Sequence, residues 1–474
     1  MDVNEFRKRG HEAVERIARY YEQELANHNV QPTVQPGFLK SLLPAEAPEE
    51  GESWDAIQQD FESKIIPGVT HWQSPNFFGF FPANSSFPGI IGDMYSDMLN
   101  GIGFNWMASP SCTELETITL DWMAKLIGLD DGFLSESEGG GVIQGSASEA
   151  VVVAMLAAKK RAMLRSEGLD ERKLVAYVSS QSHSCGLKAS MIIGVQCKVL
   201  DVDADFALSG AIVRAQIEED LKAGLVPFFI HATIGTTSSG TVDHIPEIVE
   251  AVVGTDVWVH IDAAWAGPAL MCEEYRHHGA GVDRSDSFCM NAHKWMLTNF
   301  DCSLLWVKHR RYLLDALSLT PAYLRNKETE SGLVTDYKDW QLPLGRRFRS
   351  LKLWFVLRTY GAQGIRAHIR KHCDQAAHFE SRLRAESLFR VVTPRSFALV
   401  TFQVDAPTLE ERNRRTEWVY NQANATRRIF ITSTKLRDQY VIRFVPGSPH
   451  TEMAHVDGAF DMIREFAASV PNSE

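Results

Sequence analysis

The chain has 474 residues, and its length, composition and charge exclude several classes of protein. Hydrophobic residues make up 45% and charged residues 23%, which is ordinary globular usage and excludes collagen-like and disordered chains. The net charge of −12 argues against a nucleic-acid partner. The sequence contains no apolar run of about 18 residues, as a membrane span requires, and the N-terminus lacks a signal peptide's apolar core. We expect a soluble, cytoplasmic protein of about three folding units.

Cysteine and histidine spacing gives no sign of a disulfide framework or a metal centre. The seven cysteines are odd in number, widely spread and without a CxxC pair. The sixteen histidines include no HExxH pattern. We therefore expect reduced thiols and no metal.

The N-terminal part combines helices with an aromatic loop. Amphipathic patterns predict one helix to about Ala26 and another over Trp54–Ile66. The loop over residues 70–82 carries many large apolar rings without a clear period. Such rings suit a surface covered by a ligand or another chain, and packing between domains would explain them equally well.

From about residue 140 to 308, short strand-like runs alternate with helical stretches such as Ile212–Ala223 and Ile245–Val253. This order predicts an α/β domain with a largely parallel sheet and helices on both faces. Ligands in such sheets bind at the carboxyl ends of the strands. The predicted strands are Leu174–Val178, Cys197–Val202, Val226–Thr233, Val257–Ala263, Ser287–Asn291 and Ser303–Val307.

The chain after about residue 350 reads as a second, smaller folding unit. Helices are predicted over Leu351–Tyr360 and Ile365–Leu383. Strands are predicted over Ala398–Val404, Ile429–Thr434 and Tyr440–Phe444. This part is therefore α/β as well.

A glycine-rich segment, Gly139–Ala150, precedes a helix predicted over Val151–Arg165. Glycine and serine at a helix entrance leave backbone N–H groups and hydroxyls to bind an anion at the positive end of the dipole. The segment is neither a P-loop nor a dinucleotide fingerprint, because Gln144 stands where the third glycine would be. An ordinary helix cap explains it equally well.

Two charged residues follow predicted strands. Asp262 ends one apolar strand, where a carboxylate needs a cationic partner, and Lys294 follows another among apolar neighbours, where a lysine loses its proton readily. Each alone is typical of a structural charge. Together with a phosphate-binding segment they fit pyridoxal 5′-phosphate, which needs a phosphate site, an acid at its ring nitrogen and a Schiff-base lysine.

The segments around these residues resemble the signatures of group II pyridoxal-phosphate-dependent decarboxylases of the aromatic-L-amino-acid type. The resemblance spans nearly the whole chain. It is carried by Gly139–Ala150, His260–Gly267, Asn291–Trp295, Glu5–Gly10, Pro67–Trp72, Ser109–Glu116 and Pro343–Ser350.

The resemblance implies a pyridoxal-phosphate-dependent transferase-like fold of type I. Its mainly parallel, seven-stranded sheet would be flanked by helices. The implied divisions are a helical, dimer-embracing segment over residues 1–86, a large cofactor-binding domain over 87–350 and a small α/β domain over 351–474. The protein would be a homodimer.

The resemblance also implies a role for each site residue. Lys294 would form the Schiff base, Asp262 would keep the ring nitrogen protonated, and His183 would stack on the ring. His293 would stand beside the Schiff base, near the substrate carboxylate. The other implied cofactor contacts are Ser146, Ala147, Ser148 and Asn291 at the phosphate, Thr237 at the 3-oxygen and Ala264 against the ring.

Two residues bear on the type of reaction. In the family, a tyrosine on a mobile loop donates the proton to Cα after carbon dioxide leaves, and Tyr323 corresponds to it. The polar stretch 325–337 is then expected to be a lid that excludes water. Related aldehyde synthases replace either this tyrosine or the ring-stacking histidine, whereas this chain keeps Tyr323 and His183.

The implied substrate pocket is more apolar than in animal relatives. Phe80 stands where these relatives usually carry tyrosine, and Ala83 where they carry threonine. Gly345, where histidine and plant tyrosine decarboxylases tend to carry serine, leaves room for an indole. We hypothesise a preference for tryptophan, 5-hydroxytryptophan or phenylalanine over dihydroxyphenylalanine. The remaining implied lining residues are Trp72, Phe81 and Pro82, with Ile102 and Phe104 from the second subunit.

The sequence therefore predicts a decarboxylase that converts aromatic L-amino acids to arylalkylamines, such as tryptamine, and carbon dioxide. The first alternative is an oxygen-dependent aromatic acetaldehyde synthase on the same fold. An aminotransferase would want an arginine clamp for the substrate carboxylate, and no unique candidate stands out. An inactive scaffold is disfavoured because Lys294, Asp262 and His183 are all present.

Overall fold

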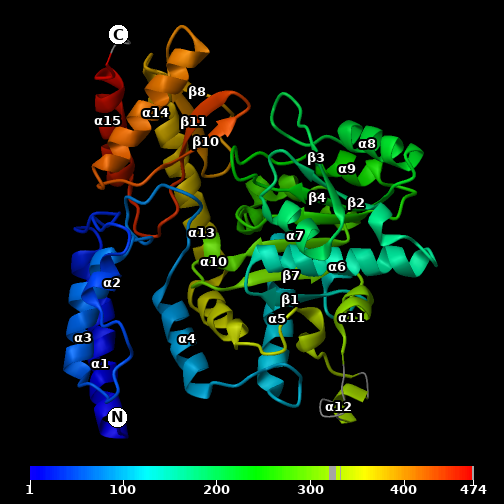
Figure 1. Ribbon diagram of the computed structural model, residues 1–474, viewed down its shortest axis with the longest axis horizontal. Coiled ribbons are helices and arrows are strands. Elements are labelled where there is room, and N and C mark those ends of the chain that lie inside the picture. Colours follow the sequence, from blue (N-terminus) through cyan, green and yellow to red (C-terminus); the bar gives the residue numbers. More distant parts are fainter. Residues whose placement is uncertain (320–326, 331–332, 472–474) are drawn as a thin grey trace. The chain divides into compact units, whose positions relative to one another are not determined.

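The computed structural model describes residues 1–319, 327–330 and 333–471 (Figure 1). This part of the chain divides into two compact units. The central unit comprises Ala83–Ala376 and Thr393–Val400, and the terminal unit comprises Met1–Pro82, Ala377–Val392 and the residues from Thr401 onward.

The central unit is built on a seven-stranded sheet with the order β1-β7-β6-β5-β4-β2-β3. Strands β2 to β6 pair in parallel, and β7 runs antiparallel to both of its neighbours. The predicted mainly parallel, seven-stranded sheet is thus confirmed. The strands are β1 Gly140–Gln144, β2 Leu174–Ser179, β3 Gln196–Leu200, β4 Val226–Thr233, β5 Trp258–Asp262, β6 Ser287–Asn291 and β7 Ser303–Val307.

Helices flank this sheet. Helix α6 contacts β1 and β4 to β7 and lies across the sheet, with small residues such as Ala150, Ala154 and Ala157 fully buried (Figure 1). Small side chains let a helix approach a sheet closely. The helices are α4 Phe87–Leu99, α5 Pro110–Ile127, α6 Ala147–Arg165, α7 Cys185–Ile193, α8 Gly210–Lys222, α9 Ile245–Ala251, α10 Ala292–Trp295, α11 Arg311–Leu317 and α12 Lys327–Glu330.

Helix α13, Arg349–Ala385, joins the two helices predicted on either side of residue 361. Gly361 interrupts the helical geometry with φ 60° and ψ 174°. A positive φ is accessible to glycine at little cost, which explains why a kink falls at this residue.

One expectation is wrong in part. The segment Gly139–Ala150 is expected to form an anion-binding helix entrance, but Gly140 and Gly141 begin strand β1. A Cβ atom at Gly139 would come within 2.4 Å of the Val307 carbonyl oxygen, and one at Gly141 within 2.8 Å of the Trp306 ring. These glycines therefore allow β1 to approach β7 closely, and only the segment after Gln144 enters the helix.

The terminal unit contains a four-stranded sheet with the order β10-β11-β9-β8. Pairs β8/β9 and β10/β11 are antiparallel. The strands are β8 Phe389–Val391, β9 Val400–Val404, β10 Thr432–Leu436 and β11 Gln439–Phe444, and the helices are α1 Val3–Arg19, α2 Phe38–Leu42, α3 Trp54–Asp60, α14 Leu409–Ala425 and α15 Met453–Ala468.

The aromatic loop over residues 70–82 packs within the terminal unit. The Phe78 N–H donates to the Phe430 carbonyl (2.8 Å), and the Phe78 carbonyl accepts from the Val445 N–H (3.0 Å). Phe77 and Phe78 are buried, whereas Trp72 is 39% and Phe80 49% exposed. Part of the ring cluster is therefore structural, and part is left on the surface.

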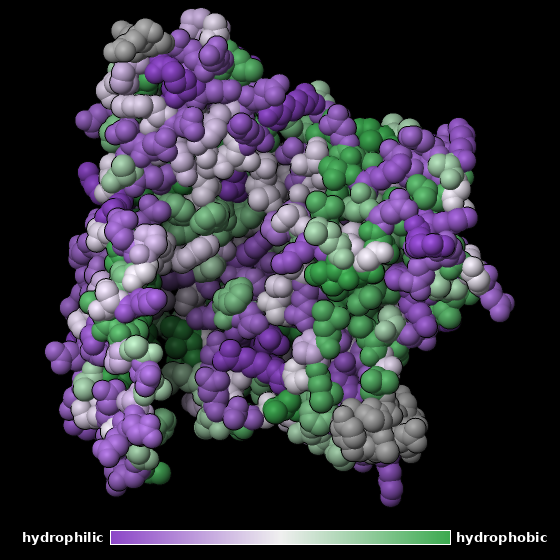
Figure 2. Space-filling view, in the orientation of Figure 1, coloured by the Kyte–Doolittle hydropathy of each residue, from purple (hydrophilic) through white to green (hydrophobic). Residues whose placement is uncertain are grey.

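Hydrophobic side chains gather on one face of the central unit, over α7 (Figure 2). Leu187, Met191 and Ile192 are exposed there. A second exposed apolar row follows α4 and includes Ile91 and Met98. Among the described helices, each one is too short or too polar to cross a membrane.

Candidate active site

The candidate site is built at the carboxyl ends of β4, β5 and β6. Asp262 ends β5, and Asn291 ends β6. Parallel register places Thr233 opposite Asp262 and Asp262 opposite Cys289. Because parallel strands end at one edge of a sheet, residues distant in sequence meet here.

Asp262 is 3% exposed and accepts several hydrogen bonds. Its Oδ1 atom accepts the Ala264 N–H at 2.9 Å, and Oδ2 lies 3.1 Å from His231 Nε2. Burial raises the pKa of Asp262, but the His231 hydrogen bond and the nearby charges of His231 and Lys294 lower the pKa by more. The carboxylate is therefore ionised although it is buried.

Lys294 follows His293 in the short helix α10 and is half-buried. Its charge lowers the pKa of Asp262, and it also lowers the pKa of His183 and of His293. These electrostatic interactions link Lys294 to the other three predicted residues.

Both histidines of this group are held neutral. Burial lowers the pKa of His183, and the Lys294 charge lowers it further, although Asp262 opposes this. Burial is also the main cause that lowers the pKa of His293 to about 4. The Cys185 N–H donates to His183 Nδ1 (3.1 Å), and the Cys302 N–H donates to His293 Nδ1 (2.8 Å). In each neutral ring the proton therefore resides on Nε2.

The start of α6 presents backbone donors. The Glu149 N–H bonds to the Ser146 hydroxyl (3.2 Å), and the Ala150 N–H bonds to the Ser146 carbonyl (3.0 Å). The first N–H groups of a helix have no intrahelical partner. Those of Ala147 and Ser148 can therefore donate hydrogen bonds to a group outside the helix. The positive end of the helix dipole favours an anion there.

Three further predicted residues lie on neighbouring segments. The Asn291 N–H donates to the Ala264 carbonyl (2.9 Å), which ties the ends of β5 and β6 together. The Asn291 Oδ1 atom is buried and has no hydrogen-bond partner among the described residues. Thr237 is half-buried in the turn after β4. The Asn291 side chain thus has hydrogen-bonding capacity left for a ligand.

The predicted substrate-pocket residues fall into both units. In the terminal unit, Trp72 stacks on Phe80 with ring centroids 5.5 Å apart, the Arg443 guanidinium lies 5.0 Å from the Phe81 ring centroid, and Pro82 is the last residue of the aromatic loop.

In the central unit, Ile102 and Gly345 are neighbours, because a Cβ atom at Gly345 would lie 3.6 Å from Ile102 Cγ2. The Phe104 carbonyl accepts the Lys338 N–H (2.9 Å). Tyr323 lies outside the described residues, as does part of the predicted lid. Tyr337, at the end of that lid, is buried and bonds Thr117 (2.9 Å).

Three residues that contact Asp262 were not predicted from the sequence. His231 lies within β4, Cys185 begins α7 and Cys289 lies within β6. The thiols of Cys185 and Cys289 lie 3.9 and 3.8 Å from the Asp262 oxygens. His231 lies within an apolar run, and neither cysteine has a role in the predicted motifs, so only the tertiary structure identifies these contacts.

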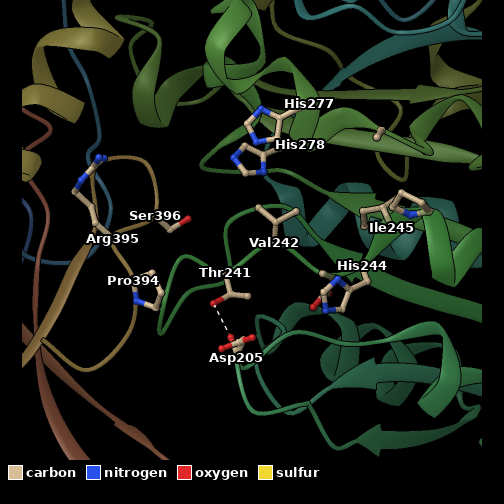
Figure 3. A pocket seen from close by; sticks show the side chains of 13 residues that line it. Asp205, Thr241, Val242, His244, Ile245, His277, His278, Pro394, Arg395 and Ser396 are labelled. Carbon is tan, nitrogen blue, oxygen red and sulfur yellow. Dashed lines mark hydrogen bonds between the residues drawn. The ribbon is translucent and has the colours of Figure 1, made fainter.

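A separate cavity of about 380 Å³ lies in the central unit (Figure 3). Its walls include His244, His277, His278 and Arg395, and they include none of the predicted site residues. His244 bonds Asp203 (2.9 Å), and burial is the main cause that lowers the pKa of His278 to about 4. The lining presents more apolar than polar surface, and His278 is uncharged at neutral pH.

Known proteins resemble this chain along nearly its whole length. The sequence model described as "Pyridoxal-dependent decarboxylase conserved domain" matches residues 36–405. The chain belongs to the pyridoxal-dependent decarboxylase family. It is 48% identical to tryptophan decarboxylase 2 of Oryza sativa subsp. japonica, over 99% of this chain and 96% of that protein. It is also 47% identical to phenylacetaldehyde synthase of Arabidopsis thaliana, over 99% of this chain and 97% of that protein.

Solved structures agree with this assignment. The crystal structure of Oryza sativa TDC with PLP and tryptamine superposes with a TM-score of 0.96 at 38% identity and covers 99% of this chain and 98% of that one. The resemblance to group II decarboxylases and the fold expected from it are both confirmed.

The site of this decarboxylase-family member fits pyridoxal phosphate. An ionised, buried carboxylate suits a protonated pyridine nitrogen, and a lysine lies close enough to lower the pKa of that carboxyl group. The start of α6 suits a phosphate, because its first N–H groups are donors at the positive end of the helix dipole. Each requirement of the cofactor thus has a residue of the right chemistry.

Proposed function

We propose that this protein is a pyridoxal-phosphate-dependent decarboxylase that converts aromatic L-amino acids to arylalkylamines and carbon dioxide. The observation that carries the proposal is the ionised, buried Asp262, which interacts electrostatically with Lys294 and His183 in a chain of this family. The names of the relatives point to aromatic substrates.

The bound cofactor supplies an electron sink for the pair left at Cα when carbon dioxide departs. Lys294 would carry the cofactor through its ε-amine and release it to the substrate amine. Asp262 would accept a hydrogen bond from the protonated ring nitrogen, and its ionised carboxylate would keep that proton on the ring. Ser146, Ala147, Ser148 and Asn291 would hold the phosphate, with Thr237 and Ala264 at the ring.

The two neutral histidines would orient the reactants. His183 would stack on the cofactor ring as an uncharged imidazole, and a neutral ring there adds no charge that competes with Asp262. His293 would direct its Nε2 proton toward the substrate carboxylate. Tyr323 would return a proton to Cα.

The substrate class follows from the apolar character of the implied pocket. Phe80 and Ala83 present no side-chain hydroxyl, and among the described residues only Ile102 lies within 4 Å of a Cβ atom built at Gly345. A pocket without a hydrogen-bond partner discriminates weakly in favour of a ring hydroxyl. We therefore propose a preference for tryptophan, 5-hydroxytryptophan or phenylalanine, with Trp72, Phe81, Pro82 and the second subunit's Ile102 and Phe104 completing the pocket.

The working protein is proposed to be a cytoplasmic homodimer. The exposed apolar residues of α4 and α7, such as Met98 and Met191, support an interface with a second copy. Seven unpaired cysteines support a reducing compartment. The proposed functional divisions remain residues 1–86, 87–350 and 351–474.

The second candidate is an aromatic acetaldehyde synthase, since a phenylacetaldehyde synthase is among the relatives. This reaction consumes oxygen and releases aldehyde, ammonia, carbon dioxide and peroxide. Retention of His183 and Tyr323 favours the decarboxylase.

Incubation of the purified protein with pyridoxal phosphate and L-tryptophan separates the two candidates. We expect tryptamine and carbon dioxide in equal amounts, with neither indoleacetaldehyde nor peroxide. Aldehyde with matching peroxide would establish the alternative, and the absence of any turnover of tryptophan, phenylalanine or dihydroxyphenylalanine would overturn both.

A further inference from the structure

His231 is a fully buried histidine that contacts the site from a neighbouring strand. It pairs in register with His260, two residues before the position opposite Asp262. Side chains two residues apart lie on the same face of a sheet, so His231 and Asp262 are diagonal neighbours on that face. His231 Nε2 lies 3.1 Å from Asp262 Oδ2.

We propose that His231 is a positioning residue for the cofactor, which keeps Asp262 ionised and fixes its orientation toward the pyridine nitrogen. This inference rests on the proposed function. Because an ionised carboxylate only accepts hydrogen bonds, the imidazole nitrogen that faces Asp262 carries the hydrogen.

The other contacts of Asp262 cannot replace this donor. The Ala264 N–H occupies Oδ1, and the thiols of Cys185 and Cys289 are weak donors at 3.9 and 3.8 Å. Loss of His231 would leave Oδ2 buried with only a distant thiol. Burial would then favour the protonated form of Asp262, which has no charge to hold a protonated ring nitrogen.

The surroundings of His231 hold its ring in place. A Cβ atom at Gly186 would lie 2.5 Å from His231 Nδ1 and 2.8 Å from Val178 Cγ1, so α7 packs directly against the imidazole. The absence of a side chain at Gly186 therefore makes room for a histidine in β4. With Nδ1 against α7, Nε2 faces Asp262.

Several titratable groups surround this pair and must be considered in a pH experiment. His260 and Asp262 come from β5, and Cys289 comes from β6. His183 and Lys294 also interact electrostatically with Asp262 or His231. Since His260 is buried on the same face of the adjacent strand and bonds Ser287 (2.8 Å), it offers a matched control.

The test compares full-length variants that keep or lose the hydrogen-bond donor that residue 231 presents to Asp262. His231→Met and His231→Gln have side chains of similar length, but only glutamine retains an N–H donor at its end. His260→Met removes a buried imidazole without removing a hydrogen bond to Asp262. The measurements are the dissociation constant for pyridoxal phosphate, the visible absorbance of the bound cofactor between pH 6 and 9, and kcat and KM for L-tryptophan.

For His231→Met we expect about tenfold weaker cofactor binding, a shift of about one unit in the spectral pH midpoint and a kcat lower by about 100-fold, with KM within about threefold. His231→Gln is expected to recover at least about tenfold in kcat. His260→Met is expected to keep the wild-type spectrum and cofactor affinity.

Three results would overturn the role of His231: wild-type cofactor affinity and spectrum in His231→Met, no recovery in His231→Gln, or equal damage in His260→Met. If His231→Met does not fold, His231→Leu takes its place with the same expectations. A wild-type protein that binds no pyridoxal phosphate would instead contradict the proposed function, so the two failures are distinguishable.

Discussion

The strand ends of the central unit and the aromatic loop of the terminal unit hold their side chains in different ways. Asp262 is fixed by hydrogen bonds from a backbone N–H and from an imidazole on the next strand. In the loop, Phe77 and Phe78 are buried, but Trp72 and Phe80 remain largely exposed. The strand ends thus fix their polar side chains by hydrogen bonds, whereas the loop leaves two of its rings on the surface; we propose reaction chemistry for the first and substrate choice for the second.

Lys294→Ala should have the largest effect, because it removes the amine that would carry the cofactor. We expect kcat to fall by at least about 10⁴-fold. The visible band of the lysine-bound cofactor should disappear, as an absorbance spectrum can establish. A matched Lys8→Ala variant on the exposed face of α1 should keep both the band and the rate. Retention of the band in Lys294→Ala would assign the attachment to another residue.

Glu116→Ala tests how firmly the central sheet is held together. Glu116 is buried, pairs with the buried Arg346 and accepts the Ile143 N–H of β1 (2.7 Å). Removal of one partner leaves an uncompensated buried charge, so the free energy of unfolding should fall by about 3–5 kcal/mol. Chemical denaturation measures this change.

An exposed ion pair provides the control for that experiment. Glu12 pairs with Lys8 and Arg9 on the surface of α1. Glu12→Ala should change the free energy of unfolding by less than about 1 kcal/mol. Equal losses in the two variants would contradict a special contribution of the buried Glu116 to stability.

Acid should lower the free energy of unfolding of the central unit, because that unit contains buried histidines. Burial is the main cause that lowers the pKa of His260 to about 3, from an unfolded value near 6.5. The unfolded state therefore binds the proton first, and stability is lost as pH falls from about 6.5 toward 3. His260→Gln should reduce the slope of unfolding free energy against pH by up to about 1.4 kcal/mol per unit in that window. At pH 8, where the imidazole is neutral in both states, this contribution vanishes; an unchanged acid slope would contradict it.

Phe80→Tyr tests the aromatic loop and should have the smallest effect. Phe80 is 49% exposed and packs 5.3 Å from the Phe430 ring, so a hydroxyl can be added without loss of the core. The ratio of kcat/KM for dihydroxyphenylalanine to that for tryptophan should rise by about tenfold, with stability unchanged. An equal rise in Phe430→Tyr would show that ring polarity in general, rather than position 80, sets the preference.

The sequence predicted the strands of the central sheet well, because apolar β-rich runs separated by helical stretches have few other interpretations. It did not predict β1, since three successive glycines are typical of a loop. The strand forms because β7 approaches so closely that a side chain at Gly139 or Gly141 would collide with it. Close approach of two distant segments leaves no local signal.

As with the strands, part of the candidate site could be predicted from the sequence and part could not. Asp262 and Lys294 follow recognisable strands and belong to motifs, so their chemistry can be inferred from sequence. His231 occupies the middle of an apolar run and belongs to none. Its contact with Asp262 depends on the pairing of β4 with β5 and on the space left by Gly186.

The α/β class and the residue types that the cofactor requires can be inferred from local sequence patterns, and the family from the resemblance of whole motifs. The side chains that keep Asp262 ionised and the buried rings of the aromatic loop become known only from the folded structure. Both outcomes depend on desolvation and on hydrogen bonds between residues far apart in the chain, such as Phe78 with Phe430. Such contacts exist only after the sheets have formed.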